Sequence, residues 1–336
     1  MAPVRRRARR GSIERPINSR LYRGSFVVVA LAVLLVAFSI VRPVALPAPQ
    51  LPANFDGPTA RSLATYLAGH YPDRSPGHAG SLAAAGWFRD QMRQYDLPVS
   101  SDTWFATIPG RGKTRLQNLW AVARGQSRQA IVVMAHRDDT GDGTGADDNA
   151  TGTAALIELA RGYALSSAGP RVRAGHTIVF LSTDAGSFGG LGALRFASHP
   201  PFRVVAAIDL DAIGGRSPPR LEIAGDAPRS PAASLVQMAW RRLDEQTGQP
   251  PGRPSVVAQL IDLGFPFTLY GQGPFVARGI PALPTPAHPA SAGRAQPPQQ
   301  SRRVAVRGCR LLHPQKLRRL AVGRSASTEP RVGGRR

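Results

Sequence analysis

Cysteine and acidic residues are scarce in this chain of 336 residues. Its single cysteine, Cys309, excludes a disulfide within the chain, so a folded domain must rely on its hydrophobic core. Only 21 acidic residues stand against 43 lysines and arginines, which gives a formal net charge of +22. Most of this excess lies in residues 1–25 and 285–336. The charge therefore describes the two ends, and it does not indicate nucleic-acid binding by the middle of the chain.

Several sequence motifs that carry a known chemistry are also absent. The chain has no Walker motif and no dinucleotide-binding glycine pattern, and its serines lack the surroundings of a nucleophile elbow. No helix-turn-helix signature or aromatic-rich basic stretch occurs between the two ends. We therefore expect neither nucleotide nor nucleic-acid binding, and hydrolysis through a covalent serine intermediate has no support.

A long uncharged run does occur near the N-terminus. Residues 26–41 contain no charge, and the preceding residues 1–25 contain eight arginines. This pattern predicts a transmembrane signal anchor over residues 26–42 in the cell membrane, with a cytoplasmic N-terminus and an extracytoplasmic remainder. A cleaved signal peptide, which would release a secreted protein, is the alternative. Residues 43–58 are rich in proline and alanine, which predicts an extended linker.

Residues 59–284 are long enough for one α/β domain with a sizeable core. Helical patterns over residues 59–68 and 81–95 precede a series of apolar runs that are typical of strands. We predict strands at residues 104–108, 116–123, 130–135, 177–182 and 204–210. Helical segments separate the strands after the third, which predicts antiparallel edge strands followed by a largely parallel sheet flanked by helices.

The most informative stretch begins where the third predicted strand ends. His136 and Asp138 follow this strand, and a loop rich in glycine and aspartate continues through Asp148 to the next helix. Asp211 similarly follows a later strand. Ligands of open α/β sheets gather beyond the carboxyl ends of the strands, so these side chains predict a metal site. The loop also partly matches a calcium loop, an alternative that is weakened because Asn149 replaces the bidentate glutamate.

The order and spacing of these motifs resemble the M28 family of di-zinc aminopeptidases. The similar segments within residues 59–284 are 136–138, 145–152, 211–214 and 275–282. The resemblance implies that His136 and Asp211 bind one zinc ion and that Asp148 bridges two. It also implies that Asp138 orients the ring of His136. The substrate would be a peptide or protein, attacked by a metal-activated water.

The chain departs from this family where a general base and a zinc ligand, both glutamates, are expected. Gly186 and Ser187 occupy these positions, and replacing both with glutamate is expected to create or raise peptidase activity. Asp184 lies nearby as a weak candidate base, and His288 is a weak candidate for a late histidine ligand. We therefore expect one zinc ion, and the sequence leaves a second one open.

Two functional classes follow from these patterns. One is a membrane-anchored, extracytoplasmic M28-like metallopeptidase of the aminopeptidase type. The other is a non-catalytic M28-like protein that binds peptides or envelope partners. Residues 285–336 are basic and lack periodicity, which predicts a disordered tail, natural or produced by a frameshift in the gene. The sequence indicates no oligomeric state.

Overall fold

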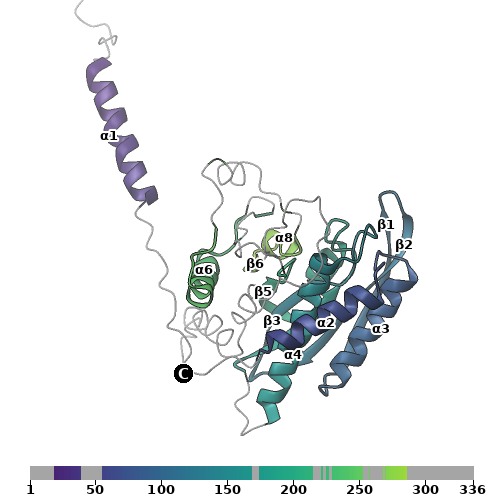
Figure 1. The fold of residues 1–336 in the computed structure, drawn as a ribbon. Coiled ribbons are helices and arrows are strands. Elements are labelled where there is room, and N and C mark those ends of the chain that lie inside the picture. The colour runs from purple at the N-terminus through teal and green to yellow at the C-terminus, as the bar shows by residue number, and fades with distance from the viewer. Residues whose placement is uncertain are drawn as a thin grey trace, which may run out of the picture. The chain divides into compact units, whose positions relative to one another are not determined.

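The structure of this chain is a computed structural model that contains two units, Met1–Pro43 and Val44–Arg336. It describes residues 19–38, 55–168, 174–214, 229–252 and 270–285, together with residues 221, 225, 226, 257 and 268 (Figure 1). The predicted cytoplasmic segment before residue 19, most of the predicted linker, His288 and the basic tail after residue 285 lie outside the described residues.

The first unit contains one described helix, α1 (Ser19–Phe38). The helix begins earlier than the predicted span of residues 26–42, and residues 39–42 lie outside the described part of the chain. It includes Arg20 and Arg23 near its start. Among the helices that the structure describes, none combines the length and the apolar character that crossing a membrane requires. The predicted helix is therefore found over residues 26–38, whereas its transmembrane role is not supported by the structure.

The second unit is built on a six-stranded sheet in the order β1-β2-β4-β3-β5-β6. The strands are β1 (Val99–Ile108), β2 (Gly112–Ala123), β3 (Ser127–His136), β4 (His176–Thr183), β5 (Arg203–Asp209) and β6 (Ala282–Pro284). Strand β2 pairs antiparallel with β1 and with β4, whereas β4, β3, β5 and β6 run parallel. The predicted mixed sheet with antiparallel edge strands is confirmed, and β6 is an additional strand.

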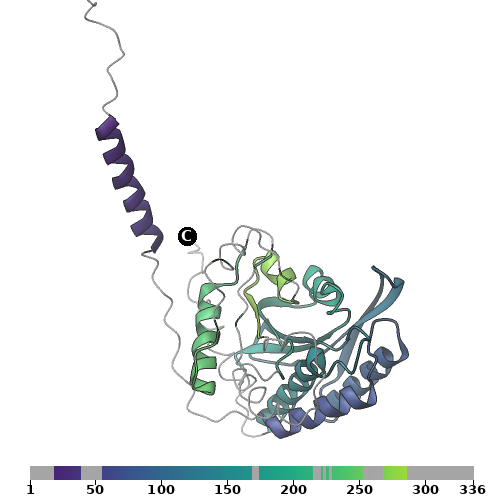
Figure 2. The ribbon, with the colours of Figure 1, turned by 45° about the horizontal axis from the view of Figure 1, so that its top comes forward.

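Helices cover both faces of this sheet, as the rotated view in Figure 2 shows. One core cluster joins a face of the sheet to three helices and to part of α6 (Ala233–Thr247). These three helices are α2 (Gly57–His70), α3 (Ala79–Arg93) and α4 (Thr151–Ala168). The other face packs against α5 (Leu191–Ser198) and α8 (Gly273–Ala277). The second unit therefore has helices, sheet and helices in three layers.

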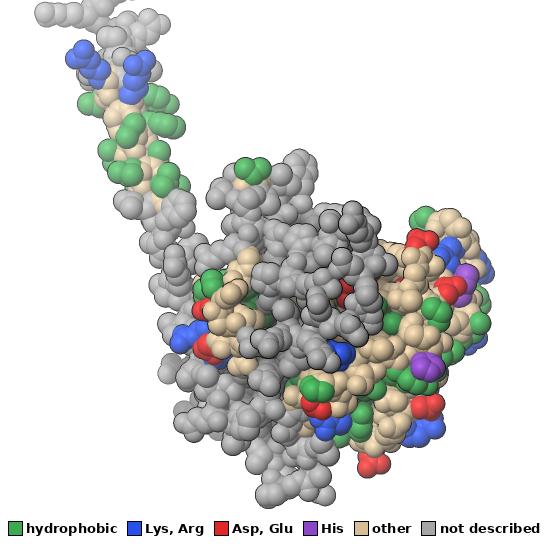
Figure 3. All heavy atoms as spheres, in the orientation of Figure 1, with side chains coloured by type: hydrophobic (Ala, Val, Ile, Leu, Met, Phe, Trp, Pro, Cys, Tyr) green, Lys and Arg blue, Asp and Glu red, His purple; other side chains and the backbone are tan. Residues whose placement is uncertain are grey.

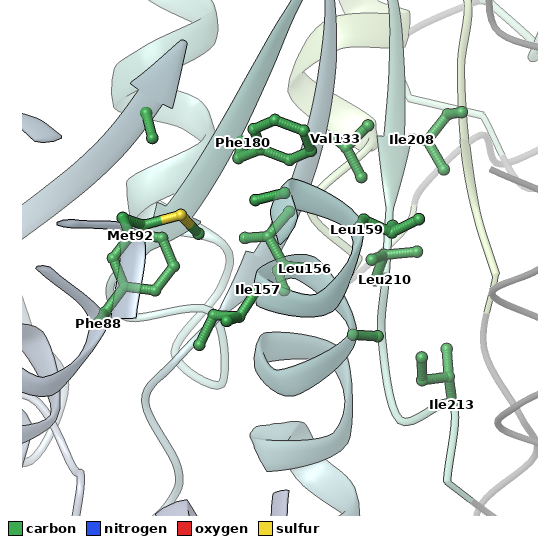
Figure 4. Close-up of a cluster of buried hydrophobic side chains, with 14 of the residues drawn as sticks. Phe88, Met92, Val133, Leu156, Ile157, Leu159, Phe180, Ile208, Leu210 and Ile213 are labelled. Carbon is green, nitrogen blue, oxygen red and sulfur yellow. The ribbon is translucent and has the colours of Figure 1, made fainter. Parts of the chain in front are cut away.

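The central strands β3 and β4 each contain an apolar run, Ala130–Ala135 and Ile178–Leu181, because both of their faces are buried there. In β3, Ile131 and Val133 belong to the core cluster under α4, while Val132 and Met134 belong to the opposite cluster. Figure 4 shows Phe180, Val133 and Ile208 on neighbouring strands, facing the side chains of α4. This packing fixes the directions of the strands, and with them the positions of the residues at their carboxyl ends.

Phe180 offers a test of this core. Its side chain is fully buried, and its ring centre lies 5.6 Å from that of Tyr163. We expect Phe180→Ala to lower the free energy of unfolding by about 3–5 kcal/mol, because it leaves a cavity under α4. Phe105→Ala is the matched control, since Phe105 is 62% exposed on β1, and it should change stability by about 0.5 kcal/mol or less. Urea unfolding followed by fluorescence measures both, and equal losses would contradict the assigned core.

Candidate metal centre

Three metal-ligating side chains meet at the carboxyl ends of β3 and β5. His136 is the last residue of β3, Asp211 closely follows β5, and Asp148 lies in the short segment η1 (Ala146–Ala150) before α4. The Nε2 atom of His136 lies 3.1 Å from Asp148 Oδ1 and 3.4 Å from Asp211 Oδ1. One ligand atom from each residue falls within 4.8 Å of the other two. The structure thus brings together three of the four predicted metal ligands.

The charges around His136 favour a cation at this place. Burial by itself lowers the pKa of the His136 imidazole, but Asp138, Asp148 and Asp211 raise that pKa well above 6.5. The histidine side chain is only 9% exposed, whereas that of Asp148 is 57% exposed. The cluster is therefore open to solvent on the side of Asp148. A metal ion that arrives there would replace the proton of the imidazole.

Asp138 connects the ring of His136 to the loop that follows β4. Its Oδ1 lies 3.4 Å from His136 Nδ1, and its carboxylate also accepts the backbone N–H groups of Gly186 at 2.8 Å and Ser187 at 3.0 Å. Burial raises the pKa of Asp138, but His136 and these two N–H groups together bring it below its ordinary value. An ionised carboxylate in this place is suited to the predicted role of orienting the histidine.

Asp184 is buried and already paired on both of its oxygens. Its Oδ2 accepts from Arg137 Nη2 at 3.1 Å and from the backbone N–H of Gln117 at 2.9 Å. Its Oδ1 accepts the backbone N–H of Ala185 at 2.9 Å. Burial raises the pKa of Asp184, and the nearby Arg137 offsets only part of that rise. Its role as a base stays a prediction, and that role would require it to leave these partners.

Asn149, which the sequence analysis did not place in the centre, positions the third ligand. Its side-chain amide donates to the backbone oxygen of Leu210 at 2.7 Å. Its Oδ1 accepts the backbone N–H groups of Gly152 at 3.0 Å and Ala212 at 3.1 Å. Asn149 thus holds the chain on both sides of Asp211. The sequence signal was its place directly after a predicted ligand, at the start of a helix.

Gly186 lies against the histidine ring so closely that no side chain fits there. A Cβ atom at this position would stand 2.3 Å from both Cβ and Cγ of His136 and 2.8 Å from its Cδ2. Non-bonded carbon atoms do not approach to such distances, so a glutamate would displace the metal ligand. The expectation that glutamates at positions 186 and 187 create activity stays a prediction, which this close approach at position 186 opposes. The cause is the pairing of the loop with Asp138.

The described residues form one group that could hold a metal ion. A histidine with two carboxylates is a donor set that zinc accepts. Across the described ranges, no other group of three histidine, cysteine or acidic side chains is close enough to hold an ion. His288 lies outside those ranges.

The contact at Gly186 generates a test of the centre. We expect Gly186→Ala to weaken zinc binding about 10- to 100-fold, because the added methyl group pushes His136 out of place. Ser187→Ala is the matched control, since the Ser187 hydroxyl has no hydrogen-bond partner and its backbone N–H is retained. Competition with a chromophoric chelator measures the dissociation constants. Unchanged zinc affinity in Gly186→Ala would contradict this geometry.

Comparison with known structures supports the fold. The chain is similar to a glutaminyl cyclase of Porphyromonas gingivalis, with 18% identity, a TM-score of 0.58 and coverage of 80% of this chain and 99% of that one. It is also similar to a Zn-dependent exopeptidase from Parabacteroides distasonis, with 17% identity and a TM-score of 0.55. That match covers 80% of this chain and 99% of the exopeptidase chain.

Sequence comparison extends this result to the family. An inactive zinc metalloprotease of Schizosaccharomyces pombe is 30% identical over 139 residues, which cover 38% of this chain. The match spans only 17% of the length of that relative. The model of peptidase family M28 matches residues 118–291, a range that contains all three clustered metal ligands. The chain therefore belongs to peptidase family M28.

Proposed function

We propose that this M28 domain binds a single zinc ion and holds peptide ligands without hydrolysing them efficiently. His136, Asp148 and Asp211 would hold the ion. The observation that carries the proposal is the contact between Gly186 and the ring of His136, which leaves the ligands in place but no room for a glutamate beside them.

Zinc, when bound, polarises a carbonyl group and lowers the pKa of a nearby water. The residues of this chain complete only part of the remaining chemistry. Asp138 orients the ligand, while Asp184 remains paired with Arg137. The position at which the family resemblance places the general base is Gly186, which has no side chain. Loss of a general base typically lowers the rate about 10²- to 10⁴-fold.

The relatives support this interpretation to different degrees. The similar Schizosaccharomyces pombe protein is named an inactive zinc metalloprotease, which agrees with a zinc-containing domain of low turnover.

The alternative is an active metallopeptidase of the aminopeptidase type. It is favoured by the intact ligand cluster and by the 57% exposure of the Asp148 side chain, which leaves the centre accessible to a substrate. Zinc content and turnover distinguish the two functions.

The first measurement is the zinc content of the purified full chain. We expect one zinc ion per chain, lost in His136→Ala and kept in His78→Ala, which removes a half-exposed histidine that pairs with Asp73. Zinc affinity should fall as the pH decreases, because a proton then competes for the imidazole, whose pKa is raised. Aminoacyl-nitroanilide hydrolysis should stay at background. Two zinc ions together with turnover that depends on His136 would instead support the peptidase.

We further propose that α1 anchors the chain in the cell membrane, with the N-terminus in the cytoplasm and the domain outside. Residues 26–38 of this helix carry no charge, and basic side chains lie near its start. Figure 3 shows these basic side chains at one end of the helix, whose other visible side chains are mainly hydrophobic. Phe26, Val28 and Val29 are all more than half exposed on this helix. An apolar helix beside a basic segment is the pattern of a signal anchor.

Fractionation of cells that express the full chain tests this anchor. We expect the chain to remain in the membrane pellet after an alkaline carbonate wash, because an inserted apolar helix is not held by charge alone. Leu31→Arg with Leu34→Arg should move it to the supernatant, since each arginine at a helix centre costs about 2.5–3.5 kcal/mol of insertion. Leu82→Arg, at an exposed position on α3, is the control. Release of the unaltered chain would contradict anchoring, and a shortened N-terminus would indicate a cleaved signal peptide.

A further inference from the structure

Arg74 is a fully buried arginine whose side chain contacts the metal-ligand loop. It lies in the connection between α2 and α3, outside the residues that match the family model. Its guanidinium forms an ion pair with Asp139 at 3.3 Å. It also donates, at 2.8–2.9 Å, to the backbone oxygens of Tyr71, Arg137, Thr144 and Gly145. A buried arginine needs this many acceptors to offset the loss of its hydration.

Two of these acceptors belong to chain segments that carry metal ligands. Arg137 directly follows His136, and Gly145 directly precedes η1, which contains Asp148. The Nε atom of Arg74 donates to the backbone oxygen of Arg137, and its Nη2 atom donates to the backbone oxygen of Gly145. One rigid guanidinium group therefore ties the chain beside the first ligand to the chain before the second.

The glycine at position 145 makes this contact possible. Gly145 has a φ of +52°, a value that residues with side chains rarely adopt. A Cβ there would lie 2.4 Å from Arg74 Nη2 and 2.7 Å from the Cβ of Asp139. The close approach of Arg74 thus accounts for the glycine at this position.

Asp139 completes the contact from inside the loop. Its carboxylate accepts the backbone N–H of Arg74 at 3.1 Å and that of Gly141 at 3.0 Å. Asp139 is only 2% exposed, and burial raises its pKa although Arg74 opposes that shift. Main chain and side chain of Arg74 are therefore both bound to the same loop.

We propose that Arg74 is a positioning residue for the metal centre, which sets the separation of His136 and Asp148 and thereby the zinc affinity. This inference rests on the proposed zinc binding. A loop with glycines at positions 141, 143 and 145, all at positive φ, has many conformations to lose. When Arg74 holds the loop, the conformational entropy of the loop is lost during folding. Without Arg74, this entropy is lost when zinc binds, and the zinc affinity falls.

Substitution by lysine separates geometry from charge. The ammonium group of lysine keeps the positive charge opposite Asp139, but it is a compact group on a flexible stem and cannot span Arg137 and Gly145 as the planar guanidinium does. We expect Arg74→Lys, in the full chain, to raise the zinc dissociation constant at least about tenfold. The absorption spectrum of the cobalt-saturated variant should also differ from that of the unaltered chain, because the ligands would be arranged differently around the ion.

A second variant and a matched control complete the experiment. Asp139→Asn keeps the shape of the side chain while removing its charge, and it should weaken zinc binding in the same direction. The double variant should lose less affinity than the two single losses combined, because both residues act through one contact. Arg242→Lys is the control, since Arg242 is buried on α6 beside Glu245, and it should leave zinc affinity within about twofold.

The outcomes distinguish this inference from the proposed function. Zinc bound by the unaltered chain and equally well by Arg74→Lys, with the same cobalt spectrum and a lower melting temperature, would reduce Arg74 to a structural role and overturn the inference alone. If Arg74→Lys does not fold, the zinc dissociation constant and the cobalt spectrum of Asp139→Asn decide instead. An unaltered chain that binds no zinc would overturn the proposed function, and the inference with it.

Discussion

The buried carboxylate of Asp138 is the interaction on which the metal centre depends. It faces the imidazole of His136 with one oxygen and takes the backbone N–H groups of Gly186 and Ser187 on both. The backbone oxygen of Asp138 also lies 3.1 Å from Nδ1 of this ring, so the same residue holds both the ring and the loop after β4. Position 186 then has no space for a side chain. The contact at the first metal position and the lack of space at position 186 thus involve the same carboxylate.

Two buried arginine–aspartate pairs flank this centre. Arg137 pairs with Asp184 beneath the loop after β4, and Arg74 pairs with Asp139 inside the acidic loop. Each pair opposes release of its carboxylate, because a buried ion pair that loses one partner leaves an unpaired charge. Asp184 and Asp139 are held in these pairs, whereas Asp148 and Asp211 face the imidazole Nε2 of His136 and Asp138 lies beside its Nδ1. Closeness in sequence to a metal motif does not show which of these carboxylates are held in ion pairs and which face the histidine.

The sequence was sufficient for what depends on local pattern and insufficient for what depends on contact. All five predicted strands exist, and in β3 and β4 the apolar runs mark segments that are buried on both faces. Strand β6 spans three residues, too few to show such a pattern. The roles of Arg74 and Asn149 arise from hydrogen bonds to residues more than 60 positions away, which no local pattern reveals. The close approach at Gly186 likewise required the position of the His136 ring.

The contacts of Arg74 also bear on where the functional domain begins. The family model starts at residue 118, yet Arg74 reaches the ligand loop from the connection between α2 and α3. The backbone N–H of Asp56 donates to the buried Glu158 of α4 at 2.7 Å, and Phe55 packs in the main core cluster. Helix α4 starts directly after η1, so its anchoring bears on Asp148. Residues in the range 55–117 therefore contact the segments that carry the metal ligands, although they precede the motifs that identify the family.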